Sequence, residues 1–247
     1  MTSTADSPAL RVRDARLSYG GRLLFDGLDC DLPEGQTTCL LGPSGVGKSS
    51  LLRLIAGLQH AAEGSVRDAE GRPLAGRLAY MAQQDLLLPW LSVLDNITLG
   101  ARLRGETADR DKAGALLEAV GLGAEAAQLP ATLSGGMRQR AALARTLMEE
   151  RPIVLMDEPF SALDAITRLE IQSLAAKLLA GRSVLVVTHD PLEALRLGHR
   201  ILIMAGRPAQ LEELAPPAGD PPRAPGNPAL LERQAALLER LGRARAA

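Results

Sequence analysis

The sequence has few aromatic residues, with one tryptophan, two tyrosines and two phenylalanines among 247 residues. Hydrophobic residues still make up 46% of the chain, so we expect a core built from Leu, Ala, Val and Ile. No uninterrupted apolar stretch approaches the roughly 20 residues that a membrane-spanning helix needs. Residues 1–8 are polar and lack the apolar segment of a secretion signal.

The chain also has few cysteines and almost no net charge. The two cysteines, Cys30 and Cys39, have neither metal-site nor redox spacing, so we expect reduced, buried thiols in a cytoplasmic protein. The formal net charge of −1 provides no general attraction for nucleic acid. Composition therefore favours a cytoplasmic protein with no nucleic-acid partner.

A phosphate-binding motif is present. An apolar run at 37–41 leads into residues 42–49, which match G-x-x-x-x-G-K-[ST]. Glycines let successive backbone N–H groups face phosphate oxygens, and the following helix adds its positive end. Lys48 supplies a charge for the β- and γ-phosphates, and Ser49 offers a hydroxyl to Mg²⁺. The predicted phosphate-binding residues are Gly42, Pro43, Ser44, Gly45, Val46, Gly47, Lys48, Ser49 and Ser50.

Strand-like and helix-like segments alternate along the chain, which predicts a parallel sheet with helices on its faces. Strands are expected at 10–17, 23–32, 37–41, 78–81, 153–156, 183–187 and, as the last strand, 200–204. Helices are expected at 50–58, 163–179 and 191–197. The turn-rich segment 64–76 predicts a small hairpin.

The rest of the chain predicts two additions to this core. Residues 85–150 are rich in Ala and Leu, which predicts an inserted helical lobe. Seven of the 16 prolines lie within 208–228, which predicts an extended surface linker. Leucines at helical spacing then predict an amphipathic C-terminal helix docked on its own domain: Leu230, Leu231, Leu237, Leu238 and Leu241. The predicted fold class is α/β: a P-loop NTPase core with a mainly parallel sheet, an N-terminal antiparallel β part and the helical lobe.

A pair of acidic residues ends the apolar run at 153–156. A buried strand of a parallel sheet delivers its following residues to the carboxyl edge, where ligands bind. Asp157 is therefore placed to hold Mg²⁺, directly or through water. Glu158 can polarise the water that attacks a phosphate.

A second anion site is predicted where a helix begins after Pro130. Ser134 is a suitable N-cap, and Gly135 and Gly136 leave the helix terminus bare. An ordinary capped helix is the alternative that the residues alone leave open. However, Leu-Ser-Gly-Gly-x-x-Gln at 133–139 resembles the signature of ATP-binding-cassette (ABC) ATPases.

Further motifs over residues 10–204 resemble this family in the same order. Tyr19 lies where the family has an aromatic that stacks on adenine. Gln83 resembles the Q-loop glutamine that contacts Mg²⁺ and water, with Gln84 as the competing assignment. Residues 161–164 resemble the D-loop that contacts a partner subunit, and His189 resembles the switch histidine at the γ-phosphate. His60 and His199 match no motif and are expected at the surface.

The resemblance implies an ABC ATPase that uses ATP and Mg²⁺. The tail beyond Arg207 lies outside the resemblance, and we expect one domain over 8–247. Two copies would form a head-to-tail dimer, with each ATP between the P-loop of one chain and the Ser134 region of the other. Glu158 would be the base, assisted by Lys48, Gln83 and His189. A soluble ABC ATPase acting on DNA or ribosomes is the alternative function. This alternative is disfavoured because the chain has a single cassette, no heptad run and a net charge of only −1. A P-loop kinase is a third possibility, but it would not explain the signature at 133–139 or His189.

The family also implies partners at the cytoplasmic face of the cell membrane. A transported substrate would pass through separate permease subunits, with a periplasmic or lipid-anchored substrate-binding protein as an indirect partner. Residues 86–90 and 93–97 resemble the nitrate, sulfonate and taurine importer group, which includes importers of thiamine-precursor pyrimidines. Trp90 follows Pro89, which favours an exposed loop and a permease contact. A buried core position is the alternative for this tryptophan.

Overall fold

The structure is a computed structural model that describes residues 8–246. Its strands form two sheets, one with the strand order β2-β1-β4 and one with the order β5-β6-β7-β3-β8-β9. The first sheet is antiparallel, and the second is parallel except for its last pair, β8 and β9. The strands are β1 (Pro8–Tyr19), β2 (Arg22–Pro33), β3 (Thr37–Leu41), β4 (Glu63–Asp68), β5 (Leu78–Met81), β6 (Ile153–Asp157), β7 (Ser183–Val187), β8 (Arg200–Gly206) and β9 (Ala209–Leu214).

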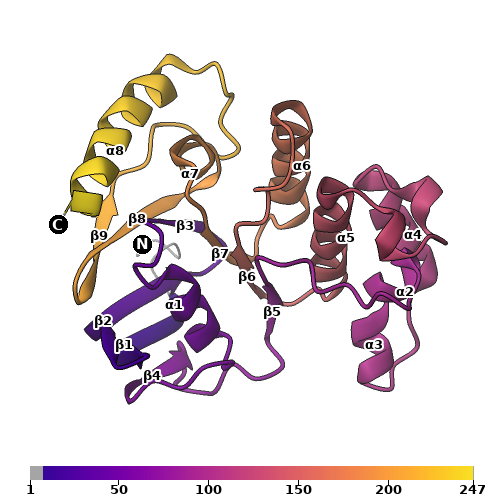
Figure 1. The fold of residues 1–247 in the computed structure, drawn as a ribbon, viewed down its shortest axis with the longest axis horizontal. Helices are drawn as coiled ribbons and strands as arrows, with labels where there is room; N and C mark the ends of the chain where they lie inside the picture. Colours follow the sequence, from indigo (N-terminus) through magenta and orange to yellow (C-terminus); the bar gives the residue numbers. More distant parts are fainter. Residues whose placement is uncertain (1–7, 247) are drawn as a thin grey trace, which may run out of the picture.

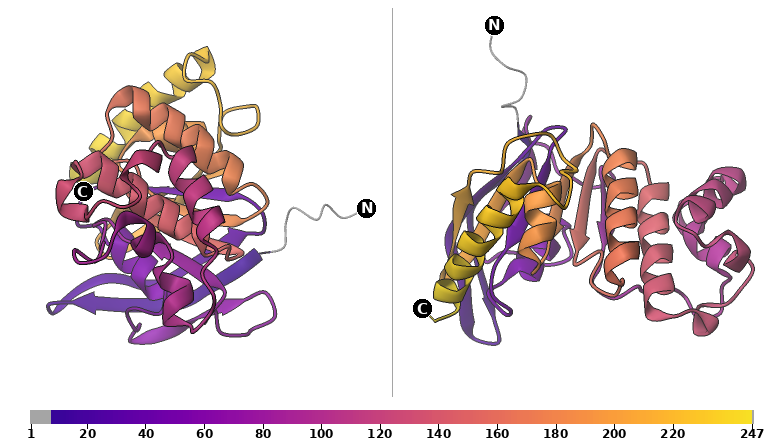
Figure 2. Two further views of the ribbon diagram at one scale, coloured as in Figure 1. Left: turned by 90° about the vertical axis from the view of Figure 1, so that its right-hand side faces the viewer. Right: turned by 90° about the horizontal axis from the view of Figure 1, so that it is seen from above.

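Helices cover the larger sheet and extend away from it (Figure 1). They are α1 (Lys48–Ile55), α2 (Val93–Ile97), α3 (Leu99–Leu103), α4 (Arg110–Ala119), α5 (Gly135–Met148), α6 (Ala165–Leu178), α7 (Pro191–Leu197) and α8 (Pro228–Ala246), with single 3₁₀ turns at Gly123–Glu125 and Pro130–Thr132. Helices α2 to α5 lie at the opposite end of the molecule from α8 (Figure 1 and the right-hand view of Figure 2). The predicted fold class is confirmed.

Both faces of the central strands are buried. In β3, Leu40 packs with Leu51 and Leu52 of α1 and with the N-terminal sheet, while Cys39 and Leu41 face the core of the other helices. This explains the apolar runs at 39–41 in β3, 153–156 in β6 and 184–187 in β7, because parallel strands covered on both sides do not alternate between apolar and polar residues. Cys30 and Cys39 are buried free thiols, as predicted.

The segment 64–76 does not form the predicted hairpin. Its first part is β4, which pairs with β1 rather than with a return strand of its own. Gly64 has φ +95°, and a Cβ atom there would lie 2.4 Å from the Asp14 carbonyl oxygen, so only glycine allows this close pairing. The following turns fold around the buried Asp68, which accepts hydrogen bonds from Arg72 and Arg77.

The prediction of a last strand at 200–204 and an extended linker from 208 is also wrong in part. Gly206 has φ +89° and pairs with Ala209, so Arg207 and Pro208 form the turn between β8 and β9. The proline is confined to the turn, and the proline-free residues 209–214 are able to pair. Further along, the buried Arg223 donates hydrogen bonds to the carbonyl oxygens of Leu195 and Gly198, which fixes the linker against the end of α7.

The C-terminal helix docks on the domain, as predicted. Leu230 and Leu237 are buried in the core that also contains residues of α7 and β8. Helix α1 begins at Lys48, two residues before the predicted start, because the positive φ of Gly47 ends the loop there. Among residues 8–246, no helix is both long and apolar enough to cross a membrane.

Candidate functional site

The P-loop joins the end of β3 to the start of α1. A Cβ atom on Gly42 would lie 2.3 Å from the Met204 carbonyl oxygen, so glycine is required where the loop passes β8. Gly47 is the N-cap of α1 at φ +118°, and within the described chain no side chain caps this helix. Its first N–H groups and its positive end therefore remain available to an anion.

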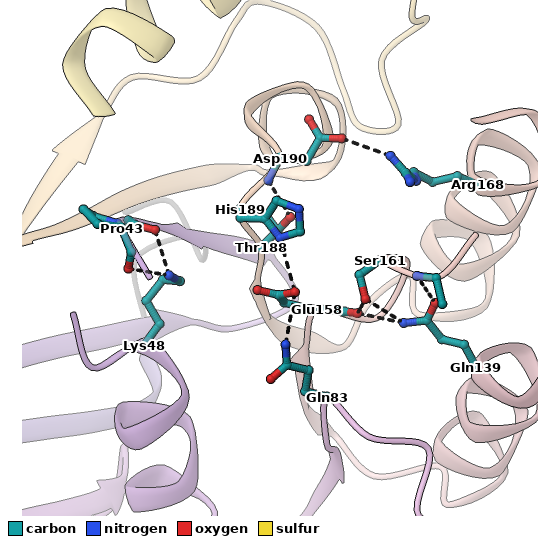
Figure 3. Close-up of polar contacts among 12 residues, drawn as sticks. Pro43, Lys48, Gln83, Gln139, Glu158, Ser161, Arg168, Thr188, His189 and Asp190 are labelled. Carbon is teal, nitrogen blue, oxygen red and sulfur yellow. Dashed lines mark hydrogen bonds and ion pairs between the residues drawn. The ribbon is translucent and has the colours of Figure 1, made fainter. Parts of the chain in front are cut away.

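The side chain of Lys48 points back toward the backbone of the P-loop at Pro43 (Figure 3). Its Nζ donates hydrogen bonds to the carbonyl oxygens of Gly42, at 2.7 Å, and Pro43, at 2.9 Å. Burial lowers the pKa of Lys48, while the charges of Glu158 and Asp157 raise it. A buried ammonium held only by carbonyl oxygens is suited to exchange them for phosphate oxygens of greater charge.

Asp157 ends β6 beneath the P-loop and is 1% exposed. Neither of its carboxylate oxygens accepts a hydrogen bond of good geometry from any residue that the structure describes. Burial raises the pKa of Asp157, and the nearby Ser49 hydroxyl lowers it. A buried carboxylate beside a hydroxyl, with both oxygens unsatisfied, fits a Mg²⁺ site.

No cluster of three or more His, Cys, Asp or Glu side chains that could hold a metal occurs in the described residues. Mg²⁺ usually takes only one or two protein carboxylates and completes its shell with phosphate oxygens and water. The sparse ligand set of Asp157 and Ser49 therefore agrees with a Mg²⁺ ion that arrives with a nucleotide.

Three side chains from the ends of neighbouring parallel strands meet beside the P-loop (Figure 3). Gln83 follows β5, Glu158 follows β6, and His189 follows β7. Gln83 Nε2 donates to Glu158 Oε2 at 3.3 Å, and His189 Nδ1 lies 3.2 Å from the same oxygen. Within the described chain the contact to Glu158 comes from Gln83, and Gln84 makes no hydrogen bond to it. Glu158 is thus held at one point by two polar groups and is suited to accept a proton from water.

The residues of the 133–139 signature lie away from the P-loop in the fold. Ser134 caps α5, and its Oγ accepts a hydrogen bond from the Met137 N–H at 3.3 Å. Ser134 and Gly135 are exposed, and neither is among the described residues that line the cavity at the P-loop. Helix α5 lies on the far side of α6 from the P-loop (Figures 1 and 2). The chain therefore does not bring its own two anion sites together.

Gln139 is a residue to which the sequence motifs assign no role of its own. It is 6% exposed, and its Nε2 donates to the Glu158 carbonyl oxygen at 2.9 Å and to Ser161 Oγ at 3.3 Å. Its Oε1 accepts from the Ala162 N–H at 2.7 Å. Gln139 thereby ties α5 to the backbone of Glu158. Its position as the last residue of the 133–139 motif was the one sequence feature that could have indicated this role.

The cavity at the P-loop has a volume of about 540 Å³. It is lined on one side by residues 42–46 and His189, and on another by Leu238, Leu241 and Gly242 of α8, which sequence patterns do not place there. Tyr19, at the end of β1, is 72% exposed and does not line the cavity in the part of the chain described. His60 and His199 are exposed, as predicted.

The loop after Gln83 ends in an exposed apolar tip. Trp90 is 70% exposed, so its interpretation as a core residue is wrong. Arg145 donates hydrogen bonds to the carbonyl oxygens of Asp85 and Leu86, and Arg138 pairs with the Asp85 carboxylate. These contacts fasten the loop to α5.

Known proteins resemble this chain over almost its whole length. A family model described as "ABC transporter" matches residues 25–161. An uncharacterized ABC transporter ATP-binding protein from Haemophilus influenzae is 44% identical over 238 residues, covering 94% of this chain and 98% of that protein. The aliphatic sulfonates import ATP-binding protein SsuB from Delftia acidovorans is 44% identical over 237 residues, covering 95% and 94%.

Solved structures extend the resemblance to the fold. A dimeric ATP-binding cassette in a post-hydrolysis state, bound to ADP and phosphate, matches with a TM-score of 0.75 at 29% identity, covering 87% of this chain and 99% of that one. The family model spans more than half of the chain, including the P-loop, Gln83, Ser134 and Glu158. This chain therefore belongs to the ABC transporter family and is an ATP-binding ATPase.

Proposed function

We propose that this chain is the ATP-hydrolysing subunit of an ABC importer, which dimerises on ATP and drives a separate permease. The observation that carries the proposal is the meeting of Gln83, Glu158 and His189 beside the P-loop. A binding module would need the P-loop alone, whereas a carboxylate aligned by two polar groups serves hydrolysis.

The residues divide the reaction between them. Lys48 and the N–H groups of the P-loop bind the triphosphate, and Tyr19 is proposed to stack on adenine. Glu158 accepts the proton of the attacking water, while Gln83 orients that water and His189 stabilises the charge that develops on the γ-phosphate. Asp157, Ser49 and Gln83 would hold Mg²⁺. When bound, this ion neutralises charge on the β- and γ-phosphates.

The separation of Ser134 from the P-loop supports a dimer with composite sites. A phosphate-binding helix terminus that lies away from its own chain's nucleotide is useful to a second chain. In this arrangement Ser134, Gly135 and Gly136 complete the site of the partner subunit. The dimeric cassettes among the similar structures agree with this proposal.

The cargo is proposed to be a small nutrient of the sulfonate, nitrate, taurine or thiamine-precursor pyrimidine type. Relatives named as aliphatic sulfonate importers, at 43–44% identity, favour a sulfonate. The chain is then peripheral to the cytoplasmic face of the membrane, with a permease as direct partner and a substrate-binding protein as indirect partner.

Growth of a deletion strain tests this function. We expect loss of growth when an aliphatic sulfonate is the sole sulfur source, restored by the wild-type chain and not by Lys48→Ala. Sulfate, as sole sulfur source, is the control. Normal growth of the deletion strain on every candidate sulfur, nitrogen and pyrimidine source would refute the importer function.

A further inference from the structure

Arg168, in the first turn of α6, contacts two segments that border the catalytic site. Its Nη2 donates a hydrogen bond to the Leu163 carbonyl oxygen at 2.8 Å. Its Nη1 lies 3.5 Å from the Asp190 carboxylate (Figure 3). Leu163 belongs to residues 161–164, which resemble the D-loop of the family. Asp190 directly follows His189. One guanidinium group therefore joins the segment 161–164 to the turn that carries His189.

The imidazole of His189 is not fixed by packing. Its side chain is 62% exposed, and its polar contact within the described chain is the one to Glu158 at 3.2 Å. The residues on either side of it are held instead. Thr188 is buried, and its Oγ1 accepts a hydrogen bond from the Asp190 N–H at 3.0 Å. The direction in which the imidazole leaves the chain therefore depends on the backbone of Thr188 and Asp190.

Asp190 uses its two carboxylate oxygens for different contacts. Oδ1 caps α7 by accepting hydrogen bonds from the N–H groups of Leu192, at 2.9 Å, and Glu193, at 3.4 Å. Oδ2 is the atom that faces Arg168. The cap fixes Asp190 to its own helix, whereas the ion pair fixes it to α6. Removing the arginine therefore frees the turn at His189 from α6 without removing the cap.

A separate buried network holds α6 against α7. Gln172 lies one turn after Arg168, and its Nε2 donates to Glu193 Oε2 at 3.1 Å. Its Oε1 accepts from Arg196 Nη1 at 2.7 Å. Gln172, Glu193 and Arg196 are each at most 5% exposed. The two helices therefore stay packed when the pair of Arg168 and Asp190 is lost, and a variant at Arg168 is expected to fold.

Arg168 faces the site residues rather than the nucleotide. With Glu158, Ser161 and His189 among its neighbours, it lines a cavity of about 20 Å³. Among the described residues it does not line the cavity at the P-loop. Its Nε is buried without a hydrogen-bond partner in the described chain. Such a buried donor costs stability, and a partly exposed ion pair offsets little of this cost. The pair is therefore better explained by its position beside His189 than by a contribution to stability.

We propose that Arg168 is a positioning residue for ATP hydrolysis, which holds His189 in place through Asp190 and ties it to the segment 161–164. The proposal rests on the proposed function, in which His189 stabilises the charge on the γ-phosphate and the segment 161–164 contacts the partner subunit. The place of His189 then depends on the position of that segment. Because Arg168 does not touch the nucleotide, its loss slows hydrolysis and leaves ATP binding unaltered.

Arg168→Met and Asp190→Asn test the link from both ends. Asparagine keeps an oxygen that can cap α7 and removes the charge that faces Arg168. Arg104→Met is the matched control, because it removes an ion pair of similar exposure, with Glu149 at 2.6 Å, in the helical lobe. The measurements are kcat and KM of the ATPase, ATP affinity without Mg²⁺, which prevents hydrolysis, and the melting temperature.

We expect Arg168→Met to lower kcat about tenfold, because a small misplacement of a catalytic group slows its step. KM and ATP affinity stay at wild-type values, and the melting temperature falls no further than in Arg104→Met. Asp190→Asn should lower kcat to the same extent. The double variant should be no slower than Arg168→Met, since both changes break one link. Wild-type kcat in Arg168→Met, weaker ATP binding, or multiplied losses in the double variant would each overturn the proposal.

Magnetic resonance of the histidine rings gives a readout that does not depend on hydrolysis. The chain has three histidines, so the ring signals are few, and His189→Ala identifies the signal of His189. Arg168→Met should shift this signal and leave that of His60 unchanged, while Arg104→Met should shift neither. An unchanged His189 signal in Arg168→Met would overturn the link.

The His189→Ala variant also separates this proposal from the proposed function. Wild-type kcat in His189→Ala would remove the role of His189 in hydrolysis, and the positioning role of Arg168 with it. If His189→Ala is slow, adding Arg168→Met should bring no further loss of kcat in single-turnover measurements. A further loss in that background would remove the link between Arg168 and His189 alone.

Discussion

Glu158 is constrained in both its backbone and its side chain. Its φ is +50°, which is uncommon for a residue with a Cβ atom. The position is fixed by its N–H, which donates to the Val187 carbonyl oxygen at 2.8 Å, and by its own carbonyl oxygen, which accepts from Gln139. Such strain persists where surrounding contacts hold the residue, and it directs the Glu158 carboxylate toward Gln83 and His189.

The first prediction concerns this carboxylate. Glu158→Gln keeps the shape of the side chain and removes the charge that activates water, so we expect hydrolysis to fall at least about a hundredfold. ATP binding should remain, and the variant should accumulate as an ATP-bound dimer in size-exclusion chromatography. Glu170→Gln, an exposed site on α6, is the control. Turnover near the wild-type rate would contradict the role of Glu158 as base.

The second prediction concerns Glu193, a buried acid of α7 near the site. Burial raises the pKa of Glu193 from 4.5 to about 7, and Gln172 donates a hydrogen bond to its Oε2 at 3.1 Å. Because the folded pKa lies above the unfolded one, the folded chain binds this proton more tightly. The stabilising contribution of Glu193 to the free energy of unfolding is therefore fully present below about pH 4.5. It is lost as the pH rises toward about 7.

Glu193→Gln should abolish this pH dependence. Between pH 4.5 and pH 8, the wild type should lose about 3 kcal/mol of unfolding free energy relative to the variant. Urea denaturation across this range measures the difference, with Glu170→Gln as the control that keeps the wild-type slope. Parallel pH profiles for wild type and Glu193→Gln would show that this acid does not titrate on unfolding.

At the scale of elements, the loop between β5 and α2 is a rigid connection with an exposed tip. Leu87 is buried at 8% exposure, and Arg145 fixes the backbone at Asp85 and Leu86. The loop links Gln83 at the nucleotide site to Trp90 at the surface. It is therefore suited to couple a partner bound at Trp90 to the chemistry at Glu158, and we propose the permease as that partner.

The third prediction separates this contact from a role in stability. Trp90→Ala should leave the melting temperature and basal ATPase of the isolated chain unchanged, because a side chain that is 70% exposed contributes little to the core. Assembly with the permease, measured by co-purification, and transport should be lost. Leu103→Ala, at 78% exposure on α3, is the control. A large drop in melting temperature, of the kind caused by losing about 3–5 kcal/mol with a buried tryptophan, would contradict this role.

At the scale of the whole molecule, the chain is elongated, with the P-loop in one part and the signature in another (Figure 2). Hydrogen bonds from Gln139 to the Glu158 carbonyl oxygen and to Ser161 connect the two parts. A site assembled from two chains makes hydrolysis depend on dimerisation, and this dependence lets ATP drive a conformational change in a partner.

The fourth prediction tests this composite arrangement. Ser134→Arg should bind ATP but not hydrolyse it, because the arginine blocks the site of the other chain. Lys48→Ala should lose nucleotide binding itself. Mixing the two variants creates dimers with one site whose P-loop and signature are both intact, and we expect ATP trapped in that site when Mg²⁺ is absent. A mixture that behaves as the sum of its separate components would count against the head-to-tail dimer.

Sequence patterns predicted those parts of the fold and site that are local. The P-loop at 42–49 and the acids that follow β6 are each continuous in sequence, so spacing and residue type specify their chemistry. The central strands also match their predicted ranges closely, because burial on both faces leaves a plain apolar run. The hairpin error at 64–76 falls where pairing is not local, since β4 pairs with β1. The error at 208–214 has another cause, because the prolines that follow concealed a short strand that pairs locally with β8.

The sequence by itself thus determined the nucleotide chemistry, the α/β class and the likeness to one family, because each rests on short motifs or on periodicity. Only the tertiary structure decided that Gln83, Glu158 and His189 meet, because their contact follows from the order β5-β6-β7 in the sheet, which no single segment encodes. Packing likewise decided that Gln139 holds the backbone of Glu158 and that Leu238 faces the P-loop cavity while Leu231 does not. A leucine pattern fixes which residues share a helix face, whereas the neighbour of that face depends on how distant segments fill space around the core.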